Sequence, residues 1–165
     1  MSELYSPPDV DEQNRLWGAN CGPCALAALT NRPVADIRAE VEIAQGGRFL
    51  GYMNAGHLTD VLRRMGFSPW RRDVRTRGEV VWPRTRGLVV LQIDGPWCEP
   101  GVNPRARFRY THTVASAEGG VMIYDCNADK WRRRENWERE IMAFLVKDQK
   151  RATGWYTSSV IDVAR

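Results

Sequence analysis

The sequence contains no long hydrophobic run. No segment approaches the ~18 to 20 consecutive apolar residues that a membrane span requires, so we expect no membrane contact. Residues 1–9 are acidic and lack the apolar core of a secretion signal, which predicts a cytoplasmic protein. With 165 residues, 43% of them hydrophobic, the chain is long enough to bury the core of one globular domain, and it is not a disordered chain.

Lysine is scarce. Lys130, Lys147 and Lys150 are the three lysines, and arginine supplies the other 21 of the 24 basic residues. Arginine is the preferred partner of phosphate and carboxylate groups, and the densest cluster, from Arg63 to Arg86, has the charge of a nucleic-acid surface. That cluster carries no nucleic-acid-binding motif, and a GC-rich genome also explains the bias. We therefore give nucleic acid less weight than a protein or peptide as the partner.

Cysteine and histidine are also few. The four cysteines are Cys21, Cys24, Cys98 and Cys126. Without a secretion signal they are expected to be thiols, not two disulfides. Cys21 and Cys24 would supply half of a zinc site, but no second pair follows, and the two histidines, His57 and His112, lie far apart in the sequence. We predict no metal and no organic cofactor.

The hydrophobic pattern predicts helices first and strands afterwards. Residues 1–16 are predicted to be an N-terminal arm, and residues 17–165 a single domain. Helices are expected over 24–30, 33–45, 55–65 and 135–147, and strands over 87–93, 110–117, 120–125 and 155–163, with 110–125 forming a hairpin. This segregation is typical of the α+β class. The irregular loop 94–109 is expected to line a binding cleft.

The sequence Cys21-Gly22-Pro23-Cys24 supports two interpretations. It is the motif of thioredoxins, in which a dithiol at a helix N-terminus exchanges disulfides. A thioredoxin motif should follow a buried strand, whereas polar residues 11–16 precede this one. The motif itself is specific, but its surroundings are not those of a thioredoxin.

The second interpretation is nucleophilic catalysis. A thiol at the start of a buried helix has a lowered pKa, and it becomes a nucleophile if a histidine held by a third polar group can reach it. His112 lies on a predicted strand, and the hairpin brings Asp125 back to nearly the same level. Asn127 is an alternative orienting residue. His57, which opens the helix 55–65, is expected to have a capping or surface role.

Residues in this order resemble the papain-like cysteine peptidases. The closest likeness is to the bacteriocin-processing (double-glycine leader) peptidases and related phage and bacterial proteins, and it covers residues 20–29 and 110–127. The resemblance implies N-terminal helices packed on a C-terminal antiparallel sheet. It also implies that Cys21 is the nucleophile, His112 the general base and Asp125 the orienting acid. Cys24, Cys98 and Cys126 are then structural or incidental.

One position departs from the family pattern. Family members place an oxyanion-hole glutamine about one turn before the nucleophile, where this chain has Arg15. Gln13, Asn14, Asn20 or a backbone amide would have to supply that donor, whose loss typically costs ~10² to 10³ in rate.

The expected function is that of a cysteine-dependent hydrolase acting on an amide, peptide or isopeptide bond through Cys21, His112 and Asp125. Three alternatives remain open. The chain is also similar to papain-fold toxin domains that deamidate glutamine. A papain-fold binding protein without activity would use its arginines or the 94–109 loop for contact. A thiol-disulfide oxidoreductase would use Cys21 and Cys24.

Overall fold

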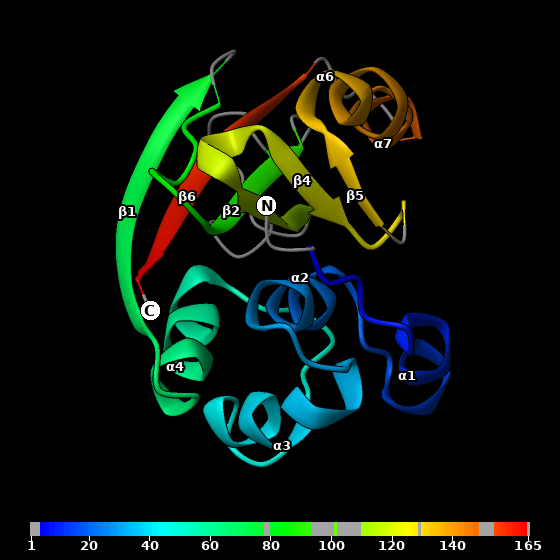
Figure 1. Cartoon of the computed structure of the whole chain (residues 1–165), viewed down its shortest axis with the longest axis vertical. Coiled ribbons are helices and arrows are strands. Elements are labelled where there is room, and N and C mark those ends of the chain that lie inside the picture. The colour runs from blue at the N-terminus through cyan, green and yellow to red at the C-terminus, as the bar shows by residue number, and fades with distance from the viewer. Residues whose placement is uncertain are drawn as a thin grey trace.

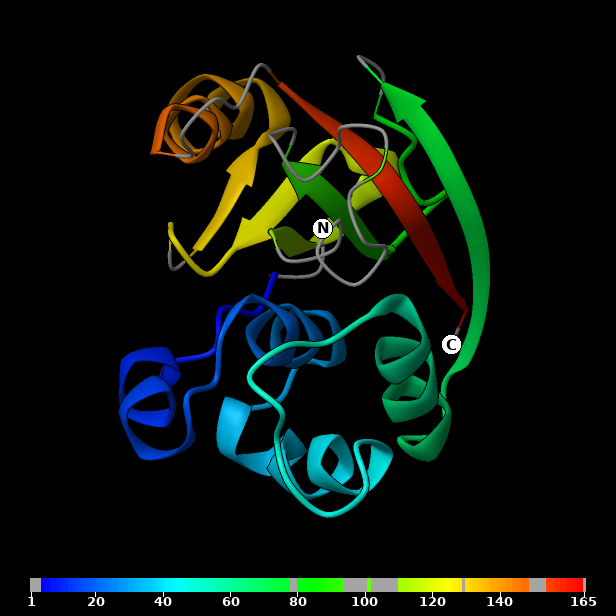
Figure 2. The ribbon, with the colours of Figure 1, turned by 180° about the vertical axis from the view of Figure 1, so that it is seen from behind.

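The computed structural model describes residues 4–77, 80–93, 101, 110–128, 130–148 and 154–164. Helices and sheet occupy separate layers, with the first four helices below the sheet in Figure 1 and the same division seen from behind in Figure 2. The four helices are α1 (Val10–Trp17), α2 (Cys21–Thr30), α3 (Val34–Ala44) and α4 (Ala55–Arg64). The predicted α+β class, with N-terminal helices packed on a C-terminal antiparallel sheet, is confirmed.

Over the described residues, the sheet has six antiparallel strands in the order β1-β6-β2-β3-β4-β5. Their bounds are β1 (Ser68–Arg77), β2 (Gly87–Ile93), β3 (Thr111–Ala117), β4 (Met122–Asp125), β5 (Lys130–Arg133) and β6 (Trp155–Ala164). Strands β3 and β4 form the predicted hairpin, joined by a short turn η2 (Glu118–Gly120). After β5 the chain forms α6 (Arg134–Trp137), the π turn η3 (Glu138–Met142) and α7 (Ala143–Asp148), where the sequence predicts one helix.

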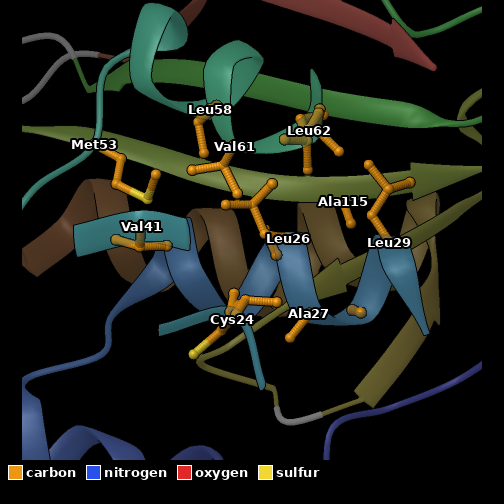
Figure 3. Close-up of a cluster of buried hydrophobic side chains, with 14 of the residues drawn as sticks. Cys24, Leu26, Ala27, Leu29, Val41, Met53, Leu58, Val61, Leu62 and Ala115 are labelled. Carbon is orange, nitrogen blue, oxygen red and sulfur yellow. The ribbon is translucent and has the colours of Figure 1, made fainter. Parts of the chain in front are cut away.

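Helix α2 is the centre of the molecule because almost all of it is buried. Every residue from Gly22 to Thr30 is buried, as expected from the run of alanine and leucine. One side of the sheet packs on this helix through alternate residues such as Leu88, Val90 and Ala115. Figure 3 shows Leu26 and Leu29 of α2 in one cluster with Val61 and Leu62 of α4.

The opposite face of the sheet carries a second, smaller core. Val89, Leu91 and Val114 point to this side and pack on Trp137, which is fully buried. The Trp137 ring makes edge contacts with the rings of Trp82 and Trp155, at centroid distances of 6.0 and 6.1 Å. Helix α6 is therefore fixed against the sheet by an aromatic cluster.

The start of α2 differs from the prediction. The hydrophobic pattern predicts a helix over 24–30, whereas the helix begins three residues earlier, at Cys21, and Asn20 is the N-cap. Pro23 is tolerated as the third residue because the first-turn N–H groups have no acceptor within a helix. The first helical hydrogen bond runs from the Cys24 N–H to the Asn20 carbonyl, at 3.0 Å.

Helix α1 lies, except for Trp17, in the predicted N-terminal arm (1–16), and its inner side buries Val10 and Gln13. Residues before it also contact the domain. The carboxylate of Asp9 accepts hydrogen bonds from the backbone N–H groups of Val34 (2.8 Å) and Ala35 (2.9 Å), at the start of α3. The indole of Trp131 on β5 donates to the Tyr5 carbonyl, at 2.8 Å. The N-terminal segment thus bonds to both layers.

Candidate active site

The structure brings together the three residues predicted to act in catalysis. Cys21 is the first residue of α2, His112 the second of β3 and Asp125 the last of β4. The Cys21 thiol hydrogen-bonds to the imidazole of His112. His112 Nε2 lies 2.7 Å from Asp125 Oδ2, which leaves Nδ1 as the nitrogen that faces the sulfur.

The unequal lengths of two strands create room for Cys21. Strand β4 pairs with β3 only along Ala115–Ala117, so β3 continues past the end of that ladder. The start of α2 lies against this free edge, where the backbone N–H of Thr113 donates to the Cys21 sulfur. Side chains two residues apart on a strand point to the same face of the sheet. His112 therefore points to the same face as Val114, and Asp125 to the same face as Ile123. This is the face on which Trp137 packs. The three residues therefore meet at the open edge of the sheet.

Asp125 is fully buried, and its carboxylate is saturated with hydrogen-bond donors. Oδ2 accepts from His112 Nε2 and from the indole N–H of Trp137 (2.8 Å). Oδ1 accepts from the backbone N–H (2.9 Å) and the side-chain amide (3.0 Å) of Asn127. A buried charge is tolerated when it is paired and hydrogen-bonded in this way. Among the described contacts, Asn127 therefore holds Asp125 and does not orient His112 directly.

The pKa values of the three groups favour an ion pair. Burial raises the pKa of the Cys21 thiol, but the hydrogen bond and charge of His112, together with the Thr113 amide, outweigh it and bring the pKa below its ordinary value. Burial lowers the pKa of His112, but the charge and hydrogen bond of Asp125, with the help of Cys21, raise it to about 10. Burial also raises the pKa of Asp125, and His112 and Trp137 more than reverse that effect. The three shifts all run in the direction that favours a thiolate, an imidazolium and a carboxylate.

The predicted oxyanion-hole residues occupy different environments. Asn14 and Arg15 are exposed, whereas Gln13 is 7% exposed and accepts from the Trp17 indole at 3.0 Å. That contact leaves the Nε2 group of Gln13 without a hydrogen bond among the described residues. Asn20 uses its amide to donate to the Gly51 carbonyl, at 2.7 Å. Gln13 is therefore the buried member of the set with an uncommitted donor.

Sequence reasoning missed two contributors to the site. Trp137 packs in the core, and its indole N–H also donates to Asp125. The backbone of Thr113 contacts the nucleophile. Neither contribution leaves a pattern in the sequence. The Trp137 bond joins residues twelve positions apart, and the Thr113 bond comes from the backbone at the edge of a strand.

Cys24 and Cys126, the other cysteines that the structure describes, have surroundings different from those of Cys21. Cys24 is fully buried in the core beneath α2 (Figure 3). Cys126 is half-buried, and burial together with the neighbouring Cys21 and Asp125 raises its pKa. Cys98 and all of the loop 94–109 except Gly101 lie outside the described residues. Within the described ranges, no group of histidine, cysteine and acidic side chains is arranged to hold a metal ion.

Arginines of the cluster from Arg63 to Arg86 pair largely within the molecule. Arg63 and Arg64 bond to acidic side chains on the helices. Arg71 forms two hydrogen bonds with Asp73, and Arg72 pairs with Asp162. In each of these four pairs, an acidic side chain offsets the charge of the arginine. None of the helices that the structure describes is long and apolar enough to cross a membrane.

No family model matches the chain, and no curated protein matches it either. Among solved structures, the chain is similar to the peptidase domain of Streptococcus ComA, a bi-functional ABC transporter involved in a quorum sensing pathway. The identity is 14%, the TM-score is 0.46, and the alignment covers 98% of each chain. At this level of likeness, the comparison assigns no role to individual residues of this chain.

Proposed function

We propose that the protein is a papain-like cysteine hydrolase that cleaves an amide bond in a peptide or protein. The observation that carries the proposal is the hydrogen-bonded series of Cys21, His112 and Asp125. It has the order of nucleophile, base and orienting group that activated nucleophiles require. Its lowered thiol pKa and raised imidazole pKa support the same assignment.

In the first half of the reaction, the Cys21 thiolate attacks the carbonyl carbon and forms a carbon–sulfur bond. The carbonyl electron pair moves to oxygen, giving a tetrahedral oxyanion. When the oxyanion collapses, the carbon–nitrogen bond breaks, and the imidazolium of His112 gives its proton to the leaving amine. The product is a thioester on Cys21 and a neutral His112.

In the second half, water attacks the thioester carbon. Neutral His112 removes a proton from that water, and collapse of the second tetrahedral oxyanion breaks the carbon–sulfur bond. The acid product leaves, and the thiolate and imidazolium are restored. Asp125 stays ionised throughout and holds the ring through Nε2, so that Nδ1 remains directed at the sulfur.

The start of α2 supplies the oxyanion donors in this proposal. The N–H groups of Cys21 and Gly22 have no acceptor within the helix, and the Asn20 side chain makes no capping bond to them. The helix dipole also favours negative charge at this end. The uncommitted amide of Gln13 is the side-chain donor proposed to replace the family glutamine.

The thiol-disulfide alternative has less support. Helix α1, not a buried strand, precedes the Cys21-Gly22-Pro23-Cys24 motif in the described residues. Cys24 lies on the buried side of α2 and has no exposed surface, so its thiol fills the core and is not accessible to a disulfide partner. Of the two cysteines in the motif, the proposed hydrolase therefore uses only Cys21 in the reaction.

A peptide library derived from a whole proteome tests the proposal without a known substrate. The protein and the Cys21→Ala and Cys24→Ala variants are each incubated with the library, and new peptide termini are identified by mass spectrometry. We expect the same cleavages from the wild-type protein and Cys24→Ala, and none from Cys21→Ala. Cys24→Ala is the matched control, since it breaks the two-cysteine motif but leaves the nucleophile.

Conversion of glutamine to glutamate without new peptide termini would show that the enzyme acts on side-chain amides. The proposed reaction would then be deamidation and not peptide cleavage. Loss of activity in Cys24→Ala as well as Cys21→Ala, with disulfide exchange in the wild type, would favour the oxidoreductase. An unchanged library in all three samples would contradict the proposal.

A further inference from the structure

The segment between α3 and α4 lies beside the start of α2, as Figures 1 and 2 both show. The Asn20 side chain donates to the Gly51 carbonyl at 2.7 Å, next to the nucleophile. A Cβ on Gly22 would lie 3.0 Å from Cβ of Met53, so a side chain at this position would require Met53 to shift. Residues 50–53 therefore form a wall beside Cys21, and we call them the α2 wall.

Gln45, just after α3, holds the α2 wall with both ends of its side-chain amide. Its Nε2 donates to the Tyr52 carbonyl at 2.6 Å, and its Oε1 accepts from the Leu50 N–H at 2.9 Å. Gly51, whose carbonyl receives the Asn20 bond, lies between these two anchors. The orientation of a single amide thus sets the position of the wall.

His57 on α4 fixes which way that amide points. Its Nδ1 lies 3.1 Å from Gln45 Nε2 and accepts a second, longer bond from the Asn54 N–H at 3.5 Å. Its backbone N–H donates to the Asn54 side chain at 2.9 Å, which completes the N-terminal cap of α4. The neutral ring with an unprotonated Nδ1 is the form that fits these donors.

A proton on Nδ1 would put a donor against the Gln45 Nε2 donor. Rotating the amide by half a turn would satisfy the protonated ring, because Oε1 would then face it. The same rotation would bring Nε2 against the Leu50 N–H and Oε1 against the Tyr52 carbonyl, so both bonds to the wall would be lost. Protonation of His57 at Nδ1 is therefore incompatible with the two hydrogen bonds by which Gln45 holds the α2 wall.

We propose that Gln45 and His57 form a proton-sensitive clamp that positions the α2 wall beside Cys21, closed while His57 is neutral and open when it is protonated. Both are positioning residues that act through Leu50, Tyr52 and Asn20. The consequence for catalysis rests on the proposed function of Cys21, whereas the clamp itself does not.

The charges around His57 set where the clamp opens. Burial lowers the pKa of His57, and Asp60 on the same helix opposes that effect without reversing it. From β1, Arg71 Nη1 lies 3.8 Å from where a Cβ on Gly56 would sit, and this guanidinium is paired with Asp73. The Tyr52 ring, which is uncharged, packs at a centroid distance of 6.1 Å. The clamp is thus closed at neutral pH and opens on acidification below ~6.5.

Two variants fix the clamp in its two states. His57→Asn places a carbonyl oxygen near the position of Nδ1 and keeps the acceptor without titrating, so the clamp stays closed. Gln45→Leu removes both anchors, so it stays open. Exchange protection of the Leu50 amide, measured by NMR as a function of pH, reports the wall directly. Alkylation of Cys21 by iodoacetamide in the same samples reports the nucleophile.

We expect the wild-type Leu50 protection factor to match His57→Asn at neutral pH and to fall about tenfold toward Gln45→Leu as His57 titrates, the loss of roughly one hydrogen bond. The two variants should show no such step. The clamp would be overturned if the Leu50 protection factor of the wild type stayed equal to that of His57→Asn throughout the titration. It would also be overturned if the Leu50 protection factor fell in parallel in all three proteins. An unreactive Cys21 with a normal Leu50 step would instead contradict the proposed function and leave the clamp standing.

Discussion

Asp125 determines the electrostatics of the candidate site because it is a buried carboxylate that faces a buried imidazole. Four donors surround it, and one comes from a tryptophan on the far face of the sheet. The indole of Trp137 restrains Oδ2, the same oxygen that His112 contacts. Trp137 is therefore a positioning residue for the imidazole as well as a core residue.

Trp137→Phe tests this double role. The variant loses the indole donor and part of the ring volume, so we expect the free energy of unfolding to fall by about 2–4 kcal/mol and alkylation of Cys21 at neutral pH to slow about tenfold. Trp155→Phe is the control, because Trp155 belongs to the same aromatic cluster and its change to phenylalanine removes similar ring volume but none of the four described hydrogen bonds to Asp125. Equal slowing of Cys21 in the two variants would assign Trp137 to packing alone.

Helix α2 shows what the sequence can predict at the level of an element. Its alanine and leucine content predicts a buried helix, and the structure agrees from Gly22 to Thr30. The position of its first residue was wrong because proline fits any place in the first turn. Helix α1 and strand β1 were not predicted: α1 buries little, and β1 is a charged edge strand without the alternation of a half-buried one.

Helix α3 depends on a cap that lies far away in the sequence. Asp9 accepts from the N–H groups of Val34 and Ala35, whereas Pro33, the residue at the cap position, has no side-chain oxygen. We expect Asp9→Ala to lower the free energy of unfolding by about 1–2 kcal/mol, the usual value of an N-cap, as measured by urea denaturation. Glu12→Ala removes the same charge from an exposed position of α1 and should cost less. Equal losses would show that the cap contributes nothing specific.

At the scale of the whole molecule, chain order predicted the site better than local pattern did. Cys21, His112 and Asp125 were chosen because a helix start, a strand and the end of the next strand can converge, and the structure brings them together. The capping role expected of His57 is confirmed by its bond to Asn54 at the start of α4. The contacts of Trp137 with Asp125 and of Gln45 with His57 were not predictable, because each joins elements whose packing no local pattern specifies. The role of loop 94–109 stays a prediction.

The central claim is that His112 activates Cys21, and the pH profile of cysteine alkylation tests it most directly. Each cysteine is followed by mass spectrometry after iodoacetamide treatment of the wild type, His112→Ala and Asp125→Asn. The pKa of Cys21 is lowered and that of His112 is raised to about 10. The reactive ion pair should therefore form below the ordinary thiol range near ~8.5 and persist until the pH approaches that of the imidazole.

We predict that wild-type Cys21 reacts rapidly at neutral pH, while Cys126, whose pKa is raised, reacts slowly. His112→Ala should shift the Cys21 profile upward to the range of an ordinary or buried thiol, and Asp125→Asn should shift it in the same direction. A wild-type Cys21 profile that coincides with that of His112→Ala would contradict the account, because the imidazole would then contribute nothing to the thiolate.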